Sequence, residues 1–200
     1  MTLTKSKAGV VVLPTEELRE EHREIEVALT LFALICDQAN KGTKHIANFK
    51  LMVDFFLEFA DKSHHREEEI LLFPALIFAG VRKRTGLINE LLQEHDIGRK
   101  YMREIGYLAR QARFCMTNID VARNYIKEYS CLLREHIRKE DQILYPLAES
   151  ILPLEHQQYL CEEFEHMERQ LSPGVHAHYR DVIKKMNKEY IDNMPKPYSR

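Results

Sequence analysis

The chain has 200 residues, of which 44% are hydrophobic, and it contains only 7 glycines and 7 prolines. This length and apolar content suit one hydrophobic core, and so few turn-forming residues argue against a β-sandwich or a β-barrel. The formal net charge of −2 gives no basic footprint for nucleic acid or for an anionic membrane, so we expect neither as a partner.

No targeting or membrane segment is expected. The longest apolar stretches, at 27–36 and 70–81, fall short of the roughly 20 residues of a membrane span. The N-terminal apolar run AGVVVL is too short for a secretory signal, so we expect a cytoplasmic protein. No Cys-x-x-Cys pair occurs, and buried, reduced thiols are expected at all four cysteines: Cys36, Cys115, Cys131 and Cys161.

Apolar residues recur at intervals of three and four along the chain, which predicts helices. A first helix is predicted from a start at Thr15 to Gly42. A second runs from about 44 to the high 70s with a bend or break at Pro74, because proline removes a helix hydrogen bond. A third runs from about 84 to 112. A fourth, disturbed at Pro146, reaches about 150 from a cap among Thr117, Asn118 and Asp120.

The last part of the chain predicts shorter helices. One opens at Pro153 and runs to about 171, where Ser-Pro-Gly at 172–174 breaks it, and another reaches about 190 before a tail at 191–200. Four long helices with short connections predict an all-α, antiparallel up-down four-helix bundle over residues 15–150. Residues 151–190 are expected to pack on it as additional C-terminal helices, so that residues 1–200 form a single domain.

Two segments share one pattern of residues: KSHHREEEILLFPAL at 62–76 and LLREHIRKEDQILYPLA at 132–148. In each, a His is followed by a Glu four residues later and by a Pro ten residues later. Residues four apart lie about one turn apart on the same helix face. His64 and Glu68 therefore point the same way, as do His136 and Glu140.

The same repeat extends to two further histidines. His22 precedes His64 by 42 residues, and His95 precedes His136 by 41 residues. The bundle would bring four imidazoles and two carboxylates together, and burying two carboxylates without a cation is very costly. The pattern therefore predicts a metal site with six ligands: His22, His64, Glu68, His95, His136 and Glu140.

The ligand count indicates which metal is bound. Four imidazoles and two bridging carboxylates supply four donor bonds to each of two ions, an oxo or hydroxo bridge supplies a fifth, and the sixth position stays open. Imidazole and carboxylate ligands suit iron, with zinc or manganese as substitutes, and six ligands exceed the four of a structural zinc site. The sequence predicts two Fe ions in an oxo- or hydroxo-bridged di-iron centre.

Four sequence blocks carry a family resemblance over residues 15–150: EELREEHREIE, HHREEEILLFP, LLQEHDIG and LLREHIRKEDQILYP. In this order they resemble the hemerythrin-like, or HHE cation-binding, family. The resemblance implies a four-helix bundle whose di-iron site is ligated by the six residues named above.

The chain departs from the oxygen-carrying hemerythrins of marine invertebrates. These have a histidine where this chain has Arg99, and they use an aspartate at the position of Asp141, which here follows Glu140. In these features the chain is more similar to the iron- and oxygen-sensing domain of an F-box ubiquitin-ligase subunit. It is also similar to the bacterial proteins that repair iron–sulfur clusters after nitrosative stress.

We expect a metal-binding protein whose di-iron centre reacts with O2, NO or peroxide in a sensing or binding role, with a protein partner for signalling. Two alternatives stay open: a di-iron enzyme of oxidative or nitrosative stress defence, which turns over peroxide or NO or repairs iron–sulfur clusters, and an inert metal centre. Whether the protein is an enzyme is therefore undecided.

Several residues near the motifs carry further expectations. Arg99 follows His95 by four residues, so it either lies near the metal site or its mouth, or pairs in solvent with Glu94 or Asp96. His65 is turned about 100° from His64 and is expected to face away. Glu67 and Glu69 are expected on a solvated face, with contact to the metal ligands as the alternative for Glu69. Five other histidines are expected at the surface: His45, His156, His166, His176 and His178.

Overall fold

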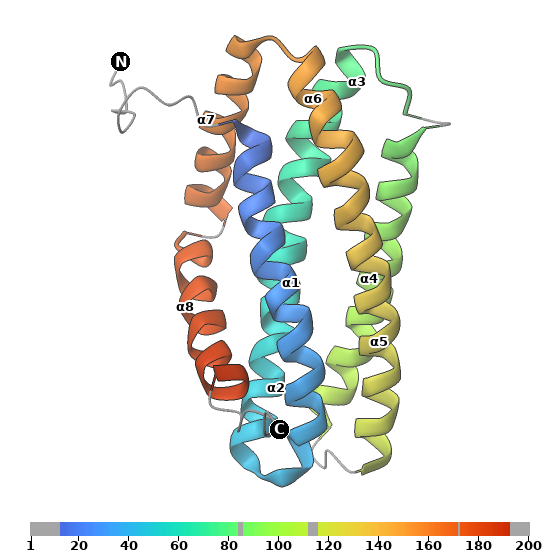
Figure 1. The fold of residues 1–200 in the computed structure, drawn as a ribbon, viewed down its shortest axis with the longest axis vertical. Coiled ribbons are helices and arrows are strands. Elements are labelled where there is room, and N and C mark those ends of the chain that lie inside the picture. The colour runs from blue at the N-terminus through green and yellow to red at the C-terminus, as the bar shows by residue number, and fades with distance from the viewer. Residues whose placement is uncertain (1–12, 84–85, 112–115, 172, 193–200) are drawn as a thin grey trace, which may run out of the picture.

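Four long helices run side by side and antiparallel in the computed structural model, which describes residues 13–83, 86–111, 116–171 and 173–192 (Figure 1). These described residues form no β-strand. The prediction of an all-α up-down bundle is confirmed. Its four columns are built on α1 (Pro14–Gln38), α2 (Thr43–Phe55), α4 (Leu87–Arg110) and α5 (Met116–Lys139).

The second and fourth columns continue through wider, π-helical turns. After α2 come η2 (Phe56–His65), η3 (Glu68–Leu72) and α3 (Phe73–Phe78), and after α5 come η4 (Glu140–Leu144) and α6 (Tyr145–Ile151).

The wider turns stand just before the two prolines. The Phe73 N–H donates to the Glu68 carbonyl and the Tyr145 N–H donates to the Glu140 carbonyl, both five residues back. Pro74 and Pro146 follow inside the first turn of α3 and α6, where a missing N–H costs little. The expected bend or break at each proline is thus a widened turn, which is common at functional sites.

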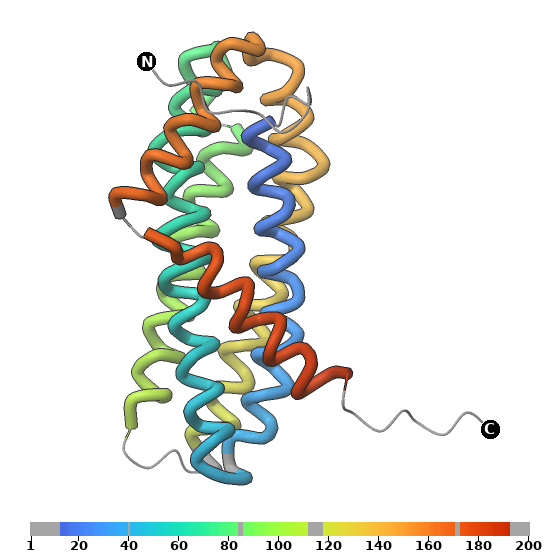
Figure 2. Tube along the Cα trace, turned by 90° about the vertical axis from the view of Figure 1, so that its left-hand side faces the viewer, coloured from blue at the N-terminus to red at the C-terminus, as the bar shows by residue number. Residues whose placement is uncertain are grey.

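The remaining helices pack on one side of the bundle. The short η1 (Ala39–Lys41) joins α1 to α2, and α7 (Leu154–Leu171) and α8 (Val175–Asn187) follow the fourth column, with η5 (Lys188–Asp192) extending α8. Both α7 and α8 contact α1, and α8 crosses the bundle obliquely (Figure 2). The additional C-terminal helices are therefore confirmed. None of the described helices is long and apolar enough to cross a membrane.

Some local expectations differ from the structure. Thr15 does not cap α1, which begins one residue earlier; its hydroxyl donates to Glu149 Oε1 at 2.7 Å instead. α5 begins at Met116, so the capping residues expected for it lie within its first turns. Of the cysteines, Cys36 is buried as expected, Cys131 is exposed and Cys161 is partly exposed, while Cys115 lies outside the described residues.

The hydrophobic core consists of two clusters that are separated along the bundle axis. The larger cluster, toward the α1–α2 turn, contains Phe32 and Phe56, and the smaller one, toward α3 and α6, contains Leu18, Leu72 and Leu144. Both clusters draw residues from all four columns. The inward-facing residues that lie between the two clusters on the four columns therefore share one layer of the bundle interior, called the interior layer below.

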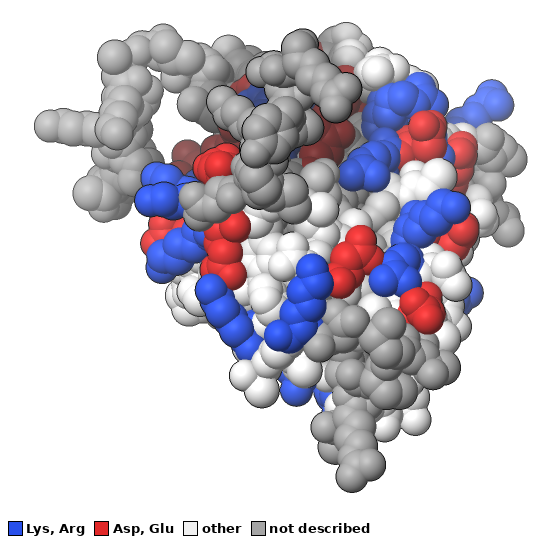
Figure 3. Space-filling model, turned by 60° about the horizontal axis from the view of Figure 1, so that its bottom comes forward, with Lys and Arg blue, Asp and Glu red and all other residues white. Residues whose placement is uncertain are grey.

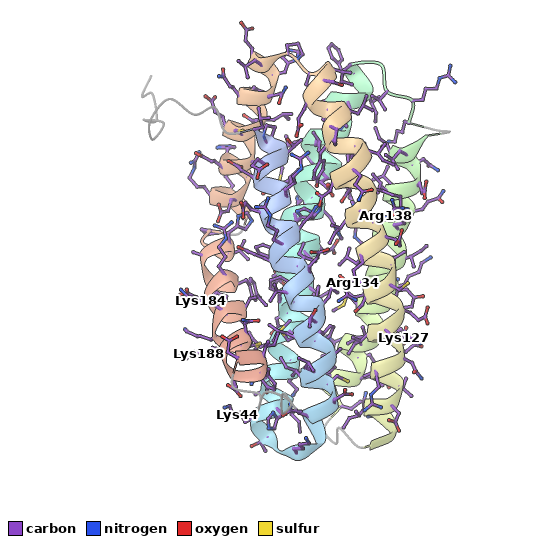
Figure 4. All side chains as sticks on the ribbon, in the orientation of Figure 1. Lys44, Lys127, Arg134, Arg138, Lys184 and Lys188 are labelled. Atoms are coloured by element: carbon purple, nitrogen blue, oxygen red, sulfur yellow. The ribbon has the colours of Figure 1, made fainter. Side chains whose placement is uncertain are left out.

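Charged side chains of both signs are intermixed over the described part of the lower end of the bundle (Figure 3). Lys127, Arg134 and Arg138 lie along α5, and Lys184 and Lys188 lie on α8 and η5 (Figure 4). All five are exposed, so these cations are turned away from the interior layer.

We expect Phe56→Ala to lower the free energy of unfolding by about 3–5 kcal/mol, because Phe56 is fully buried and its ring lies 5.1 Å from that of Phe32. The matched control is Phe78→Ala, because Phe78 is 87% exposed; its effect should stay within about 0.5 kcal/mol. Denaturant titration of both variants checks this. Equal destabilisation by the two substitutions would contradict the assigned core.

Candidate metal centre

The six predicted ligands meet in the interior layer between the two hydrophobic clusters. They come from α1, η2, η3, α4, α5 and η4, and each is at most 1% exposed. The donor atoms of these six residues form two groups within 4.8 Å, one with His22 and His64 and one with His95 and His136, and both groups contain Glu68 and Glu140. Two adjacent ions could thus be held with both carboxylates shared, as the bridging prediction requires.

Within each group, two imidazoles point their Nε2 atoms at each other. Nε2 of His22 lies 3.0 Å from Nε2 of His64, and Nε2 of His95 lies 3.0 Å from Nε2 of His136. In a neutral imidazole only one nitrogen carries a proton, and the partner of the other nitrogen decides which one.

A carboxylate accepts a hydrogen bond from Nδ1 of each of these histidines. The four pairs are His22–Asp141 at 2.8 Å, His64–Glu21 at 2.7 Å, His95–Glu69 at 2.7 Å and His136–Glu94 at 3.0 Å. A proton on Nδ1 leaves a lone pair on Nε2, so the facing nitrogens of each pair are both acceptors. Carboxylate partners of this kind orient histidines that bind metal and raise their basicity.

The motif-based prediction did not include these carboxylates, although they follow a rule in the sequence. Glu21 and Glu94 directly precede His22 and His95 in the two halves of the chain. Likewise, Glu69 and Asp141 directly follow the two predicted bridging residues. An acidic residue beside a predicted ligand at the same place in both halves could therefore have indicated these carboxylates. The histidine to which each one bonds depends on how the helices pack.

The shared carboxylates are not satisfied by the protein. Glu68 Oε2 and both carboxylate oxygens of Glu140 are buried without a hydrogen-bond partner. Glu140 Oε1 lies 3.2 Å from Nε2 of His136 and Glu140 Oε2 lies 3.3 Å from Nε2 of His22, both of which are acceptors in the neutral tautomer. Buried acceptors that face other acceptors need a cation among them. The donor set therefore fits the predicted metal ions.

Without metal, protons supply the missing positive charge. Burial lowers the pKa of His22, but the hydrogen bond to Asp141 and the Glu140 carboxylate outweigh it and raise the pKa to about 9. Burial also lowers the pKa of His136, whereas Glu140 and Glu94 raise it to about 10. Burial raises the pKa of Glu140, but the two imidazoles hold it well below its usual range.

His65 faces the centre, so the expectation that it faces away is wrong. It is 4% exposed, its ring stacks on that of His95 with 3.9 Å between centroids, and neither ring nitrogen has a hydrogen-bond partner. Donor atoms of His65, His95 and His136 lie within 4.8 Å of one another. His65 ends the π-helical η2, where a wider turn advances each residue by less than the 100° of an α-helix. The equivalent residue in the other half is Ile137.

Tyr145 is a second residue near the centre that differs between the two halves of the chain, and the motifs predicted no role for it. It is fully buried, and its hydroxyl donates to Glu68 Oε1 at 2.8 Å and lies 3.3 Å from Nε2 of His22. Its ring stacks on His22 at 5.4 Å, as the ring of Phe73 stacks on His95 at 5.9 Å in the other half. Only the tyrosine side offers a hydroxyl to the centre.

Arg99 is linked to the centre through Glu69. Its Nη2 donates to Glu69 Oε1 at 2.6 Å and its Nε donates to Asp61 at 2.7 Å, while Glu69 Oε1 also accepts from His95. The expected pair with Asp96 is present at 3.3 Å. Glu69 therefore contacts the predicted ligand His95, as the alternative expectation for this residue stated, and does not lie on a purely solvated face. Glu94 pairs instead with His136 and Lys139.

Two further side chains are less exposed than expected. Glu67 is 2% exposed, and burial together with the neighbouring carboxylates of Glu21 and Glu17 raises its pKa to about 10. His176 is partly buried, since helix packing places its Nε2 2.8 Å from Ser63 Oγ. His45 is also partly buried, against the Tyr190 hydroxyl. The surface expectation holds for the other three histidines: His156, His166 and His178.

Comparison with known families agrees with this geometry. The family model of the hemerythrin HHE cation binding domain matches residues 13–148. The chain belongs to this family. No curated protein matches the chain. The match includes all six predicted ligands of this hemerythrin-like chain and ends before α7, so α7 and α8 lie beyond it.

We expect metal ions to protect this hemerythrin-like protein increasingly as pH rises. In the folded protein the pKa is about 9 for His22 and about 10 for His136, both above the usual 6.5. The stability that these protons give to metal-free protein is therefore fully present below about pH 6.5. It is lost as pH rises through 9 and 10. Metal ions that replace these protons prevent the loss.

Thermal unfolding from pH 7 to 10 of metal-free protein and of protein loaded beforehand with Zn2+ provides the measurement. The difference in Tm between the two forms should widen toward pH 10. A constant difference over this range would show that His22 and His136 do not carry the compensating protons.

Proposed function

We propose that the chain is a non-haem di-iron protein whose centre reacts with O2, NO or peroxide in a sensing or binding role. The observation that carries this proposal is the pair of facing Nε2 atoms in each half, with every Nδ1 fixed by a carboxylate. Such an arrangement is costly in a metal-free core and favourable around two cations.

The side chains divide into two sets of donors. His22 and His64 would hold one ion, His95 and His136 the other, and Glu68 and Glu140 would be shared. His65 adds a third imidazole on the side of His95 and His136. Iron, when bound, supplies redox chemistry and a coordination position for a small ligand.

The burial of the centre selects for a small ligand. All six predicted ligands are at most 1% exposed. The void that reaches His65, among Phe56, Gly98, Met102 and Tyr129, measures about 10 Å³, which is at the lower limit of the space that admits one water molecule. A centre this buried is compatible with a diatomic molecule or peroxide as its ligand, whereas an organic substrate would not reach it.

The side chains around the centre carry protons on the Tyr145 hydroxyl and on the imidazole Nδ1 atoms. Tyr145 Oη holds its proton toward Glu68 Oε1, and the four Nδ1 atoms hold theirs toward carboxylates. These bonds orient the imidazoles, and the burial of the six ligands separates them from bulk water. As a sensor in the cytoplasm, the protein would pass the state of its centre to a protein partner.

We expect two metal ions per chain, with iron when iron is supplied during expression. His64→Ala and His136→Ala should each remove at least one ion and destabilise the loaded protein by about 3–5 kcal/mol, because they leave buried carboxylates uncompensated. Elemental analysis and thermal unfolding provide the measurements. His156→Ala is the control, since His156 is exposed on α7. One zinc per chain without iron uptake, or equal metal loss in the control, would contradict the centre.

Reaction with small ligands is tested by absorption spectra of iron-loaded protein, first without oxygen and then with air, NO or peroxide in turn. A binding role predicts a spectral change that reverses when O2 or NO is removed. Continuous consumption of peroxide or NO would instead support the enzymatic alternative. Spectra that respond to none of the three ligands would exclude both and indicate an inert centre.

A further inference from the structure

A second acidic feature lies beside the centre, between α1, the second column and the C-terminal helices. It is a cavity of about 250 Å³. Glu20 and Glu165 are exposed at its rim, while Glu21 and Glu67 are buried. The full lining consists of six carboxyl groups, one phenylalanine and two basic side chains: Glu17, Glu20, Glu21, Glu67, Glu165, Glu168, Phe164, His176 and Arg180.

The basic side chains of the lining do not neutralise it. Arg180 Nε donates to Glu24 at 2.7 Å, and His176 shares its Nε2 with Ser63, so that only its Nδ1 faces the cavity. This Nδ1 lies 3.4 Å from Glu21 Oε1 and 3.7 Å from Glu168 Oε2. Carboxyl groups therefore outnumber the basic groups that contact them.

Glu67 points independently to a ligand. Its side chain is 2% exposed and lines the cavity, and no hydrogen bond or ion pair to another described residue satisfies its carboxyl group. A buried carboxyl without a partner is expensive, so it calls for a group that enters the cavity. Glu17, on the first turn of α1, also lacks such a partner among the described residues.

One residue connects the cavity to the metal centre. Glu21 Oε1 faces His176 in the cavity, whereas Glu21 Oε2 accepts the hydrogen bond from Nδ1 of His64. The cavity is thus separated from a predicted ligand by a single carboxylate. Glu165 and Glu168 of α7 and His176 and Arg180 of α8 complete its wall, so helices beyond the family match help to build it.

We propose that this cavity binds a hydrated divalent cation and is the entry site through which Fe2+ reaches the di-iron centre. Oxygen-rich linings suit such hard cations. At about 30 Å³ per water molecule, a volume of about 250 Å³ accommodates an ion that keeps its six waters. The donor atoms need not close on the ion directly, because its waters span the distance to the carboxyl groups. The entry role rests on the proposed function.

The loading rate tests the entry role. Metal-free protein is mixed with Fe2+ without oxygen, and the double variant Glu17→Gln/Glu67→Gln is compared with wild type. We expect loading about tenfold slower, with two ions per chain still bound at the end, because the two amides cannot provide the carboxylate oxygens that hold the waters of an entering cation. Glu26→Gln is the matched control, since Glu26 is an exposed glutamate of the same helix. Its loading should follow the wild type.

A direct measurement of binding complements the kinetics. Protein whose centre holds two Zn2+ is titrated with Mn2+ and followed by electron paramagnetic resonance. One additional Mn2+ should bind in the wild type and in Glu26→Gln, and none in the double variant. If the double variant does not fold, Glu17→Gln/Glu168→Gln replaces it with the same expectation.

The experiments distinguish a wrong entry site from a wrong di-iron centre. A centre that fills with two ions, together with control-like loading in the double variant and no additional Mn2+ in wild type, would overturn the entry site alone. A double variant that ends with fewer than two ions would also overturn it, because Glu67 would then act on the centre itself. A wild-type centre that never takes up two ions would overturn the proposed function.

Discussion

The hydrogen bond from each imidazole Nδ1 to a carboxylate determines the character of the interior layer. It fixes the tautomer of all four histidines, and thereby turns four Nε2 lone pairs toward Glu68 and Glu140. An oxygen-rich outer ring and a nitrogen-lined interior follow from this one interaction. The bundle supplies the rest, because each bond joins two different columns and is lost if the columns shift by one turn.

The sequence was sufficient to predict the bundle and the approach of the six residues. The period of three and four, together with His-x-x-x-Glu in two places, places side chains on one face of a helix without any knowledge of packing. The π-helical turns were not predictable in the same way, since proline indicates a disturbed helix but not how the chain accommodates it. The inward position of His65 depends on such a turn, and the angular rule for an α-helix therefore failed there.

Cross-helix partners were also beyond the sequence. Glu21 bonds to His64 rather than to its neighbour His22, and Glu69 bonds to His95 on another column. Burial of Glu67 likewise arises from α7 and α8, whose contacts no motif specifies. The two halves of the chain are similar in ligands and different in their surroundings, with His65 opposite Ile137 and Tyr145 opposite Phe73. Two ions in such a site would be chemically inequivalent, although their predicted ligands repeat.

The π-helical turns at Glu68 and Glu140 also determine what lies above the site. In an uninterrupted α-helix, a residue five positions further on is rotated by about 140° and would point away from the glutamate. The i to i+5 bonding instead turns both aromatic rings toward the polar layer. Phe73 stacks there on His95, and Tyr145 stacks on His22 and donates to Glu68. Each widened turn thus acts as a one-residue register shift that swings an aromatic ring across the end of the polar layer, which closes it against the smaller hydrophobic cluster.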